Sequence, residues 1–140
     1  MSKLVMGLLV VQLVGGAYMF MSLASSNSAH STARATRLPS AAVFGHASLG
    51  LAAPAVWIGY LTSDWPWLTW VTLASVLLSV AGGLFMLSRT AFRPDSLGVP
   101  ASDPSDVRVV EKQIPRTVLV GHGLTAGLIV VCILVVALGA

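Results

Sequence analysis

The chain has 140 residues, of which 56% are hydrophobic and only 9% are charged. A soluble domain carries about 25% charged residues, so this composition excludes an ordinary soluble domain and indicates an integral membrane protein. The formal net charge is +3, which in a soluble protein would suggest nucleic-acid binding. Here the basic residues gather in two loops, which favours a role in membrane topology or in contacts with lipid headgroups. No nucleic-acid partner is expected.

Four apolar stretches are each long enough to cross a bilayer, which takes roughly 20 residues. These stretches are residues 4–24, 41–61, 67–88 and 117–140. The expected fold class is therefore an all-α integral membrane protein, a single membrane domain over residues 1–140 with four transmembrane helices in an up-down bundle. Little chain remains for a soluble catalytic domain, so any chemistry must come from polar groups inside the bundle or at its rim.

The distribution of basic residues predicts an orientation in the membrane. Seven of the eight lysines and arginines lie in the connections 25–40 and 89–116, and Lys3 is the remaining one. The positive-inside rule predicts that both connections are cytoplasmic and that both termini lie outside. A bacterial cell membrane is the expected location.

Aromatic residues gather near the tight turn between the second and third stretches. Such a cluster is typical of the aromatic belt at a membrane interface, and a quinone or ligand pocket lined by tryptophan is the alternative. The residues are Trp57, Tyr60, Trp65, Trp67 and Trp70.

The chain contains an internal repeat. Residues 38–46 read Leu-Pro-Ser-Ala-Ala-Val-Phe-Gly-His and residues 114–122 read Ile-Pro-Arg-Thr-Val-Leu-Val-Gly-His, so proline, glycine and histidine coincide without a gap. Each proline suits the first turn of a helix. The preceding stretches also match, because Gly15-Gly16-Ala17-Tyr18-Met19 corresponds to Gly82-Gly83-Leu84-Phe85-Met86. These matches predict a duplicated helical hairpin, over residues 4–61 and 67–140, with a pseudo-two-fold axis along the membrane normal.

The repeated histidines, His46 and His122, are the central candidates for a site. Each lies about five residues inside its span, on the order of 7–8 Å below the same membrane face. Ionisable groups inside spans are functional candidates, although a histidine can also simply hydrogen-bond a neighbouring helix. In an up-down bundle the second and fourth helices are diagonal, with axes roughly 12–14 Å apart. Two imidazoles could therefore bind one metal ion between them.

Haem b fits two histidines better than other metal centres do. Structural zinc usually takes four protein ligands, and the spans lack the carboxylates of a di-iron site. Haem iron needs only two axial protein ligands, and without a CxxCH motif the haem would be bound non-covalently. We therefore predict iron ligation by His46 and His122. Gly16 and Gly83 would leave space for the flat macrocycle or would let helices approach closely.

Several other residues have an expected role at this site. Arginine pairs well with carboxylates, so the haem propionates would meet Arg37, Arg116, Arg89 and Arg93; alternatively these cations only set the topology. Met19 and Met86 could be axial ligands or packing residues. Ser48 and Thr125 would orient an imidazole or bond helix carbonyls.

The predicted function is that of a small b-type cytochrome-like subunit of a respiratory or reductase complex. It would pass electrons between a redox partner and quinone or another haem. One alternative is a non-haem subunit that binds quinone, protons or copper through the same histidines. Another is a structural accessory subunit of a membrane complex. The sequence leaves open whether the chain is an enzyme in its own right or an electron-transfer subunit of a membrane oxidoreductase.

Overall fold

The computed structural model describes residues 1–24, 38–91 and 114–139. These residues form four helices, each apolar and long enough to cross a membrane, with mean hydropathies between 1.5 and 2.5. The helices are α1 (Ser2–Ala24), α2 (Ser40–Ser63), α3 (Trp67–Ala91) and α4 (Arg116–Ala137). The predicted four-helix membrane bundle is confirmed, and each helix ends within three residues of its predicted boundary.

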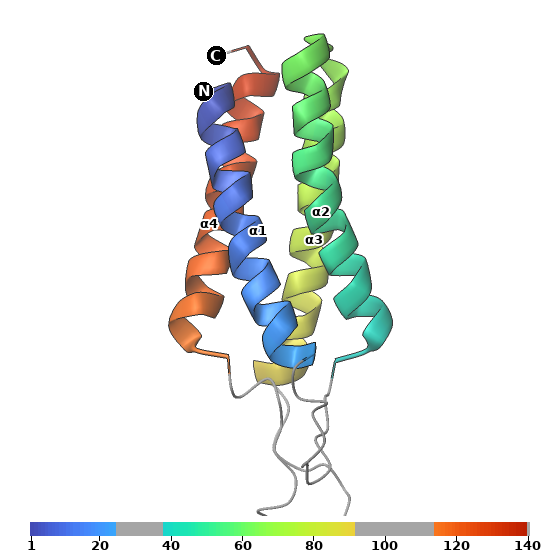
Figure 1. Cartoon of the computed structure of the whole chain (residues 1–140), viewed down its shortest axis with the longest axis vertical. Helices are drawn as coiled ribbons and strands as arrows, with labels where there is room; N and C mark the ends of the chain where they lie inside the picture. Colours follow the sequence, from blue (N-terminus) through green and yellow to red (C-terminus); the bar gives the residue numbers. More distant parts are fainter. Residues whose placement is uncertain (25–37, 92–113, 140) are drawn as a thin grey trace, which may run out of the picture.

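The four helices form a ring in which each packs against two neighbours (Figure 1). Helices α1 and α3 each contact both α2 and α4, so α2 and α4 lie on a diagonal, as predicted. The most extensive packing joins α2 and α3. We call the upper end in Figure 1, where α2 meets α3, the turn end. We call the lower end, where α2 and α4 begin, the loop end.

The second and fourth helices begin with the same backbone geometry. Pro39 has φ −60° and ψ 131°, and Pro115 has φ −58° and ψ 133°. Each proline carbonyl accepts hydrogen bonds from the N–H groups three and four residues later, at 3.0 and 3.2 Å. The prolines thus occupy the N-cap, one residue before the predicted first turn, where the carbonyl already belongs to the helix. At its other end, α2 stops at Asp64, whose left-handed backbone (φ 53°) turns the chain towards α3.

The hydrophobic core fills the turn-end half of the bundle. It contains buried residues of all four helices, namely Val5, Leu9, Ala53, Trp57, Leu73, Val76, Ile129, Cys132 and Ile133. Trp57 is completely buried, and its indole N–H donates to the carbonyl of Ser2 at 3.1 Å. The prediction of an interfacial position is therefore wrong for Trp57, because its side of α2 faces α1. Trp65, Trp67 and Trp70 are about half exposed, as an interfacial belt requires.

Candidate functional site

The four helices line a half-open cavity of about 990 Å³ in the middle and loop-end part of the bundle. This volume is at the upper end of the range for ligand sites, about 300–1,000 Å³. Most of the lining is apolar. The polar side chains that line it are Gln12, His46, Ser79, Arg116 and His122. An apolar chamber with a few convergent polar groups is the usual form of a cofactor site.

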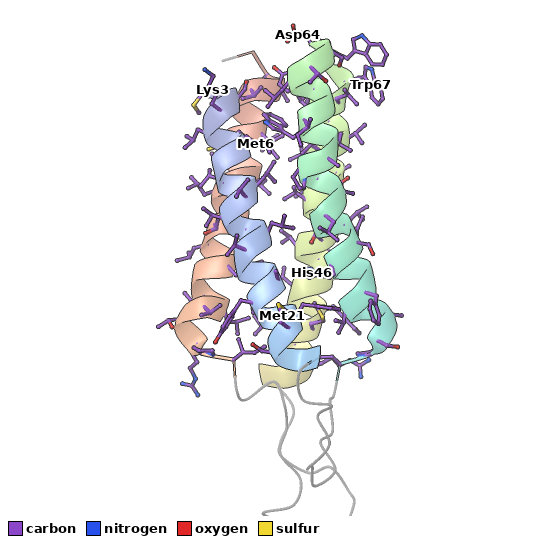
Figure 2. All side chains as sticks on the ribbon, viewed as in Figure 1. Lys3, Met6, Met21, His46, Asp64 and Trp67 are labelled. Atoms are coloured by element: carbon purple, nitrogen blue, oxygen red, sulfur yellow. The ribbon has the colours of Figure 1, made fainter. Side chains whose placement is uncertain are left out.

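The structure brings the two predicted histidines together across the diagonal of the bundle. His46 is the seventh residue of α2 and His122 the seventh of α4. Their ring centres are 6.2 Å apart and their planes are inclined by 59°. Both side chains are half-buried and line the cavity. In Figure 2 the labelled His46 lies in the loop-end half, between the helices.

Each imidazole rests on the glycine pair of a helix from the other predicted hairpin. A Cβ atom added at Gly15 or Gly16 would lie 3.3 or 3.4 Å from ring atoms of His122. A Cβ atom added at Gly83 would lie 3.3 Å from Cε1 of His46, and one added at Gly82 would lie 3.5 Å from Cβ of His46. The glycine pairs therefore hold the histidine rings, a role that the sequence did not suggest for Gly16 or Gly83.

Two further residues contact the imidazoles and were missed from the sequence. Nδ1 of His46 lies 2.8 Å from the carbonyl oxygen of Ser79 and 3.1 Å from its Oγ. Nε2 of His122 lies 2.9 Å from the amide nitrogen of Gln12. Gln12 and Ser79 each precede a glycine pair by three residues. That spacing puts them on the glycine face of the helix. It is the sequence feature from which their contact with the histidines could have been predicted.

The two residues that the sequence offered for orienting the imidazoles lie elsewhere. Ser48 is exposed. Thr125 donates its hydroxyl hydrogen to the carbonyl of Gly121, one turn earlier in α4, at 2.9 Å. Of the two roles predicted for Thr125, the bond to a helix carbonyl is therefore the correct one.

The cavity is lined by equivalent positions of the two predicted hairpins. Equivalent residues are 67 apart on α1 and α3 and 76 apart on α2 and α4. Nine such pairs line the cavity, namely Leu9 and Val76, Gln12 and Ser79, Met19 and Met86, Phe20 and Leu87, Leu38 and Ile114, Val43 and Leu119, His46 and His122, Ala47 and Gly123, and Gly50 and Ala126. The lining is therefore alike on the two sides of the chamber.

The predicted arginines differ in their positions. Arg116 lines the cavity at the loop end, whereas the guanidinium of Arg89 lies 5.0 Å above the ring of Phe85. Arg37 and Arg93 lie outside the described residues. Within the described ranges, no group of three or more His, Cys, Asp or Glu side chains gathers as a metal site. The cavity therefore offers a pair of histidines as metal-binding groups, and the predicted alternative ligands Met19 and Met86 also line it.

In comparisons with protein families, with curated proteins and with solved structures, no match was found.

Proposed function

We propose that the chain is a small b-type cytochrome-like membrane subunit, in which His46 and His122 hold one haem iron. The observation that carries this proposal is the 6.2 Å between the two ring centres. A metal–nitrogen bond is about 2 Å long, and the nitrogen lies roughly 1 Å from the ring centre, so two imidazoles on opposite sides of one metal ion have centres about 6 Å apart. The spacing fits one metal ion between the rings.

The hydrogen bond of His46 supports its role as a ligand. Its Nδ1 donates to the carbonyl oxygen of Ser79, which leaves the lone pair of Nε2 available. Histidines that bind metals commonly donate their other ring N–H to a backbone carbonyl or a carboxylate, which fixes the tautomer and the orientation of the ring. Ser79 would fix the tautomer of His46 in this way.

The likeness of the two sides of the cavity supports a flat ligand with two similar faces. A macrocycle between the histidines would meet α2 and α3 on the side of His46 and α4 and α1 on the side of His122. Each pair of equivalent lining residues has one member on either side. Its carboxylates would meet Arg116 at the loop end, because arginine binds carboxylates through two parallel hydrogen bonds.

A bound haem would supply one-electron chemistry by alternating between ferric and ferrous iron. The residues of this chain would hold the iron, exclude water with the apolar lining and set the reduction potential through the axial histidines and burial. A donor and an acceptor are then required. We propose that these are a redox partner in a respiratory or reductase complex and a quinone or another haem.

An absorption spectrum tests the proposed function. The full chain, produced with ample haem and purified in detergent, is expected to show a Soret band and, after dithionite reduction, sharp α and β bands of low-spin, six-coordinate haem. Addition of a soluble quinone analogue is expected to reoxidise the reduced protein. A featureless spectrum would remove the cytochrome proposal and favour the non-haem alternatives.

We also propose that the loop end faces the cytoplasm of a bacterial cell and that both termini lie outside. The support is that Arg89 and Arg116 lie at the loop end, whereas Lys3 lies at the turn end. The positive-inside rule places the end with more basic residues in the cytoplasm. Alkaline phosphatase fused after Ala140 is then expected to be active, and green fluorescent protein fused there to be dark. Fusions within residues 92–113 serve as the control and should behave oppositely; the reverse pattern at both sites would contradict the orientation.

A further inference from the structure

The equivalent residues Gln12 and Ser79 hold the two histidines in different ways. Ser79 offers His46 a backbone carbonyl, at 2.8 Å from Nδ1. A carbonyl oxygen can only accept a hydrogen bond, so the proton of His46 is on Nδ1 and its Nε2 lone pair is free. His46 is therefore already in the form that a metal ion binds.

The hydrogen bond of His122 has the opposite direction, because its ring nitrogen accepts. Its Nε2 lies 2.9 Å from the amide nitrogen of Gln12. An amide nitrogen can only donate, so the Nε2 lone pair of His122 is occupied and the ring proton is on Nδ1. To bind iron through Nε2, His122 has to release Gln12. The amide of Gln12 and a metal ion thus compete for one lone pair.

The hydrogen bonding around His122 is also incomplete. Its Nδ1 and the Oε1 atom of Gln12 are buried without a hydrogen-bond partner among the described residues. Buried polar groups without hydrogen-bond partners are unfavourable. A movement of His122 or Gln12 that gives these two atoms a partner would therefore lower the free energy. Nδ1 of His122 lies against the glycine pair of α1, where a Cβ at Gly15 would be 3.3 Å away.

We propose that the two histidines are unequal ligands, with His46 permanent and His122 exchangeable, so that a small neutral molecule can take the place of His122. This inference rests on the proposed haem function. With His122 bonded to Gln12, His46 would be the one histidine that holds the iron, and the place of the second protein ligand would be left to another molecule. The polarity and hydrogen-bond donors beside such a position decide which ligand binds there, and Gln12 and His122 are the polar groups on that side.

Carbon monoxide is the probe that tests this exchange. The reduced, haem-loaded full chain is expected to bind it, with a shifted Soret band and loss of the sharp six-coordinate α band. Gln12→Leu removes the competitor at nearly constant size, so His122 should stay on the iron and the affinity for carbon monoxide should fall about tenfold, the effect of one hydrogen bond. Val11→Leu is the matched control, because this neighbouring side chain of α1 is exposed and does not line the cavity. Its affinity should be unchanged.

A second measurement needs no haem. In the haem-free chain labelled with ¹⁵N-histidine, the spectrum should show Nε2 of His122 as an unprotonated, hydrogen-bonded nitrogen. In Gln12→Leu this signal should move while the signals of His46 stay in place. An unchanged His122 signal would overturn the competition between Gln12 and iron.

The two proposals fail in different ways. A low-spin haem spectrum without any binding of carbon monoxide, or an equal affinity in Gln12→Leu, would overturn the unequal ligation and leave the cytochrome function standing. The absence of a Soret band would overturn the cytochrome function itself.

Discussion

Replacing His46 by alanine is expected to abolish haem binding, and replacing His122 by alanine is expected to abolish the low-spin, six-coordinate spectrum. The two rings lie 6.2 Å apart on opposite sides of the cavity, so each would supply one axial ligand. His46 already presents a free Nε2, and its loss removes the permanent ligand. Loss of His122 should leave weakly held, high-spin haem on His46. The measurement is the Soret absorbance per protein, together with the reduced α band.

The third histidine offers a matched control for this pair. His30 lies outside the described helices, and His30→Ala is expected to retain the full spectrum. A low-spin spectrum of normal intensity in either His46→Ala or His122→Ala would contradict ligation by that residue. Loss of the spectrum in all three variants would point to a general defect of folding or haem supply, and it would leave the assignment to this pair without support.

Replacing Gly83 by leucine is expected to destabilise the bundle and to prevent normal haem binding. A Cβ atom there would already lie 3.3 Å from Cε1 of His46, so the longer side chain must displace the ring or separate α2 from α3. Overpacking of this kind costs about 1–3 kcal/mol. The free energy of unfolding, measured by titration with a denaturing detergent, should fall by this amount, and the Soret absorbance per protein should fall with it.

Gly127→Leu on α4 is the control for Gly83→Leu. A Cβ atom at Gly127 meets nothing within 4 Å among the described residues, and the position is exposed. An exposed substitution usually changes the free energy of unfolding by no more than about 0.5 kcal/mol, so this variant should resemble the unaltered protein. If Gly83→Leu were as stable and bound as much haem as Gly127→Leu, the close packing of His46 against the glycine pair would be contradicted.

The repeat made the pair of histidines predictable. His46 and His122 stand at the same place in two matched blocks, so the same backbone geometry puts both at the seventh position of a helix. The up-down order of the four helices then favours a ring in which α2 and α4 are diagonal. The partners of the imidazoles were harder to predict, because Gln12 and Ser79 differ in type and share only their spacing of three residues before a glycine pair.

The position of Trp57 shows the limit of an argument from composition. A tryptophan near the end of a transmembrane helix suits the headgroup region, and Trp65, Trp67 and Trp70 are exposed there. Trp57 lies six residues before Ser63, the last residue of α2, and is completely buried against other helices. Its helix face, rather than its residue type, decides this outcome.

The number, length and class of the helices follow from the amino-acid sequence, because a bilayer demands apolar segments of a certain length whatever they pack against. Which side of each helix faces inward does not follow from it. A helix between lipid and a packed core is apolar all round, so its hydrophobic pattern does not distinguish Trp57, which is buried, from Trp70, which is half exposed. The contacts of His46 with Ser79 and Gly83, and of His122 with Gln12 and Gly16, arise only when helices from different parts of the chain pack side by side.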